Sequence, residues 1–261
     1  MKHLLAKTAF ALAVGLVFAT ASQAADDVYA PPKPAKLKAQ TLKWVGDQKV
    51  TPAVQKQVAA IWSDADESMS PRVGFQKVIE TFAAVRPEAK TLVDSCRLVD
   101  VALLAPKAEF LKGKGLSEFY VANMKLYYGR YLAQRKMYEE ALLVLRDLDV
   151  KSVVDPATCL FFKGVCEHQL LQKKDGLATL AKLLKSTEHV PVSYANVATL
   201  MQHELTEMKG GVSLKKISLK MRNSERKLGL ARGGHRVQKL QGEIIADLDE
   251  LIEKLEQSGG S

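Results

Sequence analysis

Cysteine is scarce in this chain, and its number is odd. The 261 residues contain three, Cys96, Cys159 and Cys166, which are too few to build a disulfide scaffold. Cys159 and Cys166 are seven residues apart in a helical pattern, about 10 Å along the helix axis, so they cannot bond to each other. A bond from Cys96 to one of them remains open. We expect instead that all three are buried in helix interfaces, where a free cysteine packs like a small hydrophobic side chain.

Catalytic and metal-binding motifs are also missing. Residues 203–206 (HELT) begin like the helical zinc motif, but Glu207 stands where the second histidine would be. The Gly113-Lys114-Gly115 segment lacks the spacing of a phosphate-binding loop, and no Gly-x-Ser-x-Gly elbow occurs. The sequence therefore predicts a protein that is not an enzyme and that holds no cofactor and no metal.

A long hydrophobic run occurs at the N-terminus, within residues 1–24. Lys2 and Lys7 flank its start, residues 8–19 are almost entirely apolar, and Ser22-Gln23-Ala24 supplies the small residues that precede a cleavage site. This order predicts a cleavable signal peptide, and the run is too short for a permanent membrane anchor. We expect export to the periplasm or the extracellular space, with no integral membrane segment after cleavage.

Charge of one sign is in excess. The chain carries +9, and loss of Lys2 and Lys7 lowers this to +7, which suits an anionic surface or partner. Nucleic acid is not the expected partner, because export separates the protein from it. The basic run at residues 215–239 also contains no aromatic side chain on which bases could stack.

Residues 25–50 combine prolines and lysines, among them Pro31, Pro32, Lys33, Pro34 and Lys36. This composition predicts an extended, solvated linker. From residue 51 the pattern becomes helical, because a capping residue precedes a proline at Thr51-Pro52, Ser70-Pro71 and Asp155-Pro156. Apolar residues at three-to-four spacing follow, so residues 51–209 are expected to form one all-α, helical-repeat domain.

Residues 119–186 contain two segments with the same spacing of small residues. Gly129 and Ala141 are twelve residues apart, and Gly164 and Gly176 repeat that spacing 35 residues later. The stretch resembles the tetratricopeptide repeat, whose period is about 34 residues. Residues 138–142 (YEEAL) are its most specific part, whereas Glu167 stands where that family has an apolar residue. An ordinary helical array unrelated to that family is the alternative.

The resemblance implies a partner-binding groove lined by the first helix of each pair. Asparagine and arginine side chains would hydrogen-bond a backbone or a carboxylate there, and aromatic side chains would supply apolar contact. The groove residues carried over in this way are Asn123, Tyr127, Arg130, Gln134, Phe161, Val165 and His168.

Residues 210–257 have a different character. Val237, Ile244 and Leu251 recur every seven residues, as in a coiled-coil seam. Residues 215–239 carry nine basic residues and one acid, whereas residues 240–256 carry six acids and one lysine. Opposite charges on either side of Gly233-Gly234 predict an antiparallel helical hairpin, and a seam with a second chain is the rival interpretation. Residues 258–261 are expected to be a disordered tail.

These observations lead to one principal functional hypothesis and one alternative. The principal hypothesis is a non-enzymatic helical-repeat scaffold that binds a protein or peptide partner in the cell envelope. The alternative is a structural envelope protein that self-associates through its C-terminal coiled coil. We expect a monomer, with a homodimer as the alternative state, because a local partner helix costs little loop-closure entropy.

Overall fold

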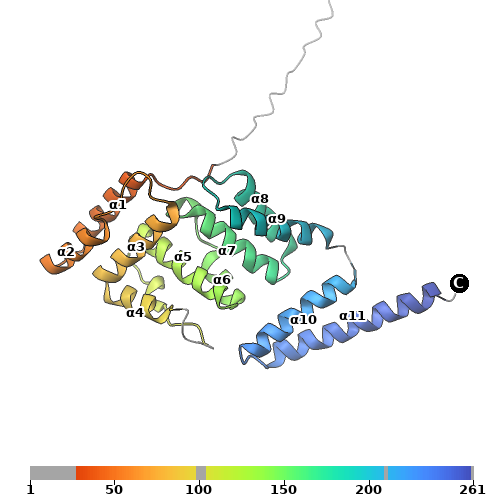
Figure 1. Ribbon diagram of the computed structural model, residues 1–261. Helices are drawn as coiled ribbons and strands as arrows, with labels where there is room; N and C mark the ends of the chain where they lie inside the picture. The colour runs from red at the N-terminus through yellow and green to blue at the C-terminus, as the bar shows by residue number, and fades with distance from the viewer. Residues whose placement is uncertain (1–27, 98–103, 209–210, 260–261) are drawn as a thin grey trace, which may run out of the picture.

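The protein is all-helical in the residues that the structure describes, which confirms the all-α part of the predicted fold class. The structure is a computed structural model, and it describes residues 28–97, 104–208 and 211–259. The predicted signal segment, residues 1–24, lies outside them. Within the described ranges there are two 3-10 helices, η1 (Glu109–Lys112) and η2 (Val150–Ser152), and no strand. The α-helices, in chain order (Figure 1), are α1 (Pro34–Gly46), α2 (Pro52–Ile61), α3 (Pro71–Val85), α4 (Pro87–Ser95), α5 (Glu118–Gln134), α6 (Tyr138–Leu145), α7 (Pro156–Gln169), α8 (Lys173–Lys185), α9 (Val192–Glu207), α10 (Leu214–Gly229) and α11 (His235–Gly259).

The predicted helix starts are confirmed by capping hydrogen bonds. Thr51 accepts a hydrogen bond from the backbone N–H of Val54, Ser70 accepts one from Val73, and Asp155 caps α7 in the same way. In each case a proline occupies the first turn, where its missing N–H costs no intrahelical bond. Local sequence therefore determines where these three helices begin.

The expectation of an extended linker over residues 25–50 is wrong for its second half, because Pro34–Gly46 forms α1. Leu37, Thr41, Trp44 and Val45 share one face of this helix and are buried. The indole of Trp44 stacks on the ring of Tyr120, with centroids 5.4 Å apart. This apolar stripe outweighs the proline and lysine content that suggested a linker, because burial of a large aromatic ring stabilises the helix against the body of the protein.

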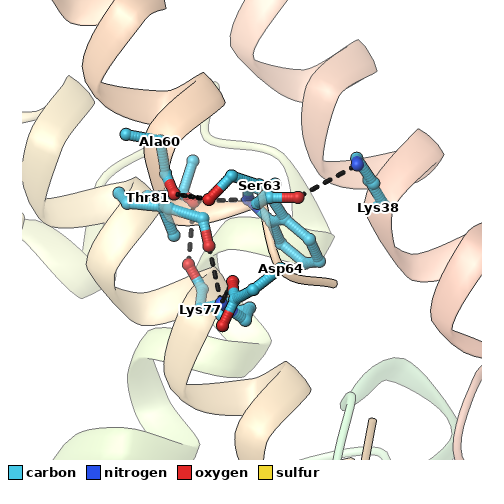
Figure 2. A network of polar contacts seen from close by, with 8 residues as sticks. Lys38, Ala60, Ser63, Asp64, Lys77 and Thr81 are labelled. Atoms are coloured by element: carbon cyan, nitrogen blue, oxygen red, sulfur yellow. Dashed lines mark hydrogen bonds and ion pairs between the residues drawn. The ribbon is translucent and has the colours of Figure 1, made fainter. Parts of the chain in front are cut away.

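A polar network joins α1, α2 and α3 at the end of α2 (Figure 2). The ammonium groups of Lys38 and Lys77 donate hydrogen bonds at the end of α2, to the carbonyls of its C-cap residue Trp62 and of its last residue Ile61, at 3.0 and 2.6 Å. The indole N–H of Trp62 donates to the hydroxyl of Thr81 at 2.9 Å. Cations at a helix C-terminus satisfy its free carbonyls and its dipole, so this network fixes the three helices together.

The corners between α5 and α6 and between α7 and α8 have matching geometry. Lys136 and Leu171, 35 residues apart, both adopt a left-handed conformation with φ of 59°. The residue after each donates its N–H to a carbonyl five residues earlier, which closes the helix end. A Cβ on Gly129 would lie 2.5 Å from Leu145, and one on Gly164 would lie 2.8 Å from Leu180. Both helix pairs therefore cross closely, at positions where only glycine fits.

The last two helices, α10 and α11, pack against each other and follow the α1–α9 array (Figure 1). The break at Gly233-Gly234 is confirmed, since α10 ends at Gly229 and α11 begins at His235. The expected disordered tail is wrong for residues 258 and 259, which belong to the last turn of α11. Residues 260 and 261 lie outside the described residues.

Candidate functional site

Asn123 of α5, which the sequence assigned to a partner groove, is fully buried and engaged within the protein. Its side-chain amide donates to the carbonyl of Phe119 at 2.8 Å, and its side-chain oxygen accepts from the N–H of Val154 at 2.8 Å. The first bond lies within α5, and the second holds the loop between α6 and α7 against α5. The expectation that Asn123 contacts a partner is therefore wrong, because no face of its side chain is open to solvent.

The other predicted groove residues of α5 lie closer to the surface. The guanidinium of Arg130 lies 6.0 Å from the ring centroid of Phe75 in α3. Tyr127 is half-buried, and burial raises the pKa of its hydroxyl to about 12. Gln134, in the last turn of α5, is exposed. Arg130 and Tyr127 thus contribute to the packing of the helices, whereas the side chain of Gln134 is exposed to solvent.

The predicted groove residues of α7 are used mainly to hold α9. The ring of Phe161 stacks on that of Tyr194 with centroids 3.9 Å apart. The ring Nε2 of His168 lies 2.8 Å from a carboxylate oxygen of Glu204, and both Phe161 and His168 are buried. Val165 is half-buried. The expectation that Phe161 and His168 face a partner is wrong, because α9 covers them.

An open cleft lies elsewhere, at the end of the array where segments distant in sequence meet. It has a volume of about 910 Å³. Its walls come from the extended residues 30–33, from one face of α1, from the start of α5 and from the loop that leads into α7. The lining residues are Ala30, Pro31, Pro32, Lys33, Lys36, Ala39, Gln40, Lys43, Glu118, Phe119, Lys151, Ser152, Val153 and Val154. We call this region the lysine cleft.

Backbone contacts fix the extended wall of the lysine cleft. The N–H of Tyr29 donates to the carbonyl of Ser186 at 2.7 Å, and its carbonyl accepts from the N–H of Glu188 at 3.0 Å. The chain then crosses the array to α1, as Figure 1 shows. On the opposite wall, the hydroxyl of Ser152 donates to the carboxylate of Glu118. Both walls are thus held in place without a partner, so the cleft is preformed.

The lysine cleft is strongly basic and has an apolar floor. Lys33, Lys36, Lys43 and Lys151 are all exposed, and Glu118 is the acidic residue in its lining. The floor includes Val153 and Val154, which are buried, and Phe119, which is half-buried. Lysine ammonium groups around an apolar floor can hold carboxylates at the rim and apolar side chains below them.

Sequence analysis placed Lys33 and Lys36 in a solvated linker and did not single out Lys43 or Lys151. The alternation of prolines and lysines was the sequence feature that could have indicated a basic site. The helical fold of α1 is needed, however, to place Lys36 and Lys43 on the same face of the helix. The loop before α7 is held beside them by the contact between Asn123 and Val154 and by the bond from Ser152 to Glu118.

A second polar cluster attaches α10 to α6. The guanidinium of Arg226 donates to the carboxylate of Glu139 at 2.8 Å and to the carbonyl of Lys136 at 2.7 Å. Its charge lies 5.0 Å from the ring centroid of Tyr138. Burial favours the neutral form of Glu139, but the hydrogen bond and charge of Arg226 outweigh it, so the pKa of Glu139 is lowered. The basic helix α10 is thus partly neutralised by α6.

The thiols and the remaining titratable groups form no reactive cluster in the ranges described. All three cysteines are free and buried, and burial raises the pKa of each thiol to about 12. In residues 28–97, 104–208 and 211–259 there is no group of three His, Cys, Asp or Glu side chains placed to hold a metal ion. No helix in those ranges is both long and apolar enough to span a bilayer.

Comparison of the chain with protein-family models, with curated proteins and with solved structures finds no match. The functional argument therefore rests on the geometry and charge of the chain itself.

Proposed function

We propose that this protein is an exported, non-enzymatic helical-repeat scaffold that binds an acidic segment of a protein or peptide in the cell envelope. The lysine cleft is the observation that carries the proposal. It is preformed, it gathers four exposed lysines around an apolar floor, and one acidic residue lines it. An extended segment that alternates acidic and apolar residues has the chemistry that complements such a surface.

The repeat assignment is supported by equivalent contacts 35 residues apart. The pairs Gly129–Leu145 and Gly164–Leu180 make the same close approach, and the two corners share a left-handed residue at the same place. We propose that α5–α6 and α7–α8 are two tetratricopeptide-like units, and that α10 and α11 form an antiparallel hairpin attached to them. Export rests on the order of residues 1–24 in the sequence.

The alternative function, a self-associating structural protein, is favoured by a different observation. Helices α10 and α11 expose several large apolar side chains that no described element covers. The two functions use separate surfaces, so each can be tested without the other.

Photocrosslinking tests the location of the binding site. The probe is a peptide of alternating glutamate and leucine that carries one photoreactive group at its centre. Mass spectrometry of the crosslinked protein is expected to find the adduct on the cleft walls, at residues 30–43, 118–119 or 151–154. Adducts confined to the α10–α11 region would contradict the proposal, and so would an absence of adducts.

A further inference from the structure

Helices α10 and α11 contact each other through one seam. Ile217 of α10 and Val237 and Ile244 of α11 are buried. The ammonium of Lys220 lies 2.6 Å from the carboxylate of Asp247 across the seam. The heptad residues predicted from the sequence, Val237 and Ile244, are therefore used inside the chain.

A second apolar stripe on each of these helices has no partner. On α10, Leu214, Met221 and Leu228 recur at seven-residue spacing with 69%, 53% and 49% of their surface exposed. On α11 the corresponding exposed residues are Ile245 and Ile252, also seven residues apart, with 60% and 52% of their surface exposed. Isolated exposed hydrophobic side chains are ordinary, but aligned ones on two neighbouring helices form a patch of the kind that marks an interaction site.

The two stripes lie on the same side of the α10–α11 pair. At about 100° per residue, Met221 lies roughly 70° around α10 from the mean direction of the seam residues Ile217, Lys220 and Ser224. Ile252 lies roughly 100° around α11 from the seam, in the same rotational sense about its own axis. The helices run in opposite directions (Figure 1), and equal rotations about antiparallel axes point to the same side. We call this side the apolar face.

The side opposite the apolar face holds the pair to the array. Arg226 and Lys227 contact Glu139 of α6 at 2.8 and 3.2 Å, and Arg232, in the turn after α10, contacts Glu140 at 2.7 Å. Arg226 lies on the flank of α10 that faces away from Met221, because five residues rotate it by about 500°. The array therefore orients the apolar face outward, away from its own surface.

We propose that the apolar face is a homodimer interface, in which the α10–α11 pair of a second copy stacks on it to form a four-helix bundle. The charges of the two helices favour a second copy of the chain as the partner. Helix α10 carries six basic residues and one acid, whereas α11 carries six acids and three basic residues. A two-fold axis parallel to the helices places α10 of one copy over α11 of the other, so basic meets acidic on both sides.

The alternative arrangements are less favourable. A two-fold axis across the helices would stack α10 on α10 and bring like charges together. An anionic membrane surface would attract α10 but repel α11, which exposes Asp249 and Glu256 next to its stripe.

The size of the face is adequate for association. Helices of 16 and 25 residues are about 24 and 37 Å long. A pair of helices is about 20 Å wide, which gives a face of roughly 500–700 Å². That is of the same order as the ~800 Å² that each partner buries in a specific protein–protein interface.

Sedimentation velocity of the full mature chain over a wide concentration range tests this interface. We expect a reversible dimer. Ile245→Glu with Ile252→Glu should raise the dimer dissociation constant about 100-fold, because each copy would bury two carboxylates. The control, Leu143→Glu with Leu200→Glu, changes two comparably exposed side chains of α6 and α9 and should leave the dimer intact. Equal circular dichroism spectra and melting curves establish that the variants are folded.

A charge exchange tests the stacking direction. Arg222→Glu alone should weaken the dimer, and adding Asp249→Lys in the same chain should restore it. A wild-type monomer at every concentration, a dimer unchanged by Ile245→Glu with Ile252→Glu, or binding of the monomer to phosphatidylglycerol vesicles in a flotation assay would each overturn the proposal.

Discussion

Gly129 lies directly against Leu145, so that a Cβ on the glycine would be 2.5 Å from a methyl carbon of the leucine. Leu145 is fully buried, and side chains in a close-packed interior have little freedom to move aside. The same relationship joins Gly164 to Leu180. The two helix pairs of the array thus depend on two glycines that the sequence pattern identified by their spacing.

Replacement of Gly129 by alanine is expected to lower the free energy of unfolding by roughly 1–3 kcal/mol, because the new methyl group overpacks the α5–α6 crossing. The control is Gly242→Ala in α11, where a Cβ would meet nothing within 4 Å. That change should raise helix stability by up to about 1 kcal/mol. Chemical denaturation measures both, and an unchanged Gly129→Ala protein would show that α6 can move away at little cost.

Glu167 is a buried carboxylate at a position where the proposed tetratricopeptide-like repeat would have an apolar residue. It is 2% exposed, and burial raises its pKa although a hydrogen bond from Thr179 opposes the shift. A carboxyl group whose pKa is raised on folding disfavours the folded state once it ionises. The stability of the protein therefore falls as pH rises from below the unfolded pKa of the group to above its folded pKa. Glu167→Leu should therefore stabilise the protein at pH 7 by about 1–3 kcal/mol.

The stabilisation by Glu167→Leu should shrink as the pH is lowered toward 4, where the wild-type carboxyl group becomes protonated. The matched control is Glu207→Leu, an exposed position on α9, for which a change within about 0.5 kcal/mol is expected. Thermal melts at several pH values give both results. Destabilisation by Glu167→Leu at neutral pH would mean that the carboxylate is stabilised by contacts that outweigh its burial.

The contact between Arg226 and Glu139 should make the attachment of α10 sensitive to acid. A carboxyl group whose pKa is lowered on folding contributes stability above its unfolded pKa, and that contribution is lost as pH falls through the folded pKa. The pKa of Glu139 is lowered by Arg226 despite burial. Hydrogen exchange at residues 214–229 should therefore accelerate as pH falls below about 4, after correction for the intrinsic exchange rate.

At neutral pH, Arg226→Ala should give the same acceleration, whereas Lys215→Ala, at an exposed position of the same helix, should not. Protection that survives both acid and Arg226→Ala would show that apolar contacts hold α10 to the array without the ion pair.

The three cysteines should resist modification in the folded protein. The thiolate is the reactive form, and burial raises the pKa of Cys96, Cys159 and Cys166 to about 12. At neutral pH the thiolate fraction is more than about a thousandfold below that of a free thiol. Alkylation followed by intact mass should detect no rapid adduct until denaturant is added, and fast native labelling of any one thiol would contradict its burial.

Local signals predicted the helices well. Capping residues before prolines located the starts of α2, α3 and α7, and the glycine spacing located the crossings of α5 with α6 and of α7 with α8. The same reasoning missed α1, because its prolines and lysines were weighted above the stripe of Leu37 and Trp44. The composition of a segment indicates how that segment behaves in isolation. Trp44, however, packs on the ring of Tyr120, which lies 76 positions later in the chain.

The lysine cleft could not be predicted from the sequence, because its walls come from three segments that are far apart in the chain. Its extended wall depends on the pairing of Tyr29 with Ser186 and Glu188, which no local pattern indicates. The groove residues carried over from the repeat family were misplaced for a related reason. Asn123 bonds to Val154 and His168 contacts Glu204. These residues of the same chain occupy the positions at which a partner was expected.

Fluorescence anisotropy of a labelled peptide of alternating glutamate and leucine, titrated with the protein lacking residues 1–24 at moderate ionic strength, tests the proposed binding function most directly. The account predicts saturable binding that weakens at least about tenfold in Lys36→Glu with Lys43→Glu, since two favourable charges become unfavourable. Lys174→Glu with Lys185→Glu, which alters the net charge equally at exposed positions of α8, should bind like the wild type. Equal loss in both double variants, or no binding by the wild type, would contradict the account, because attraction would then depend on net charge or be absent altogether.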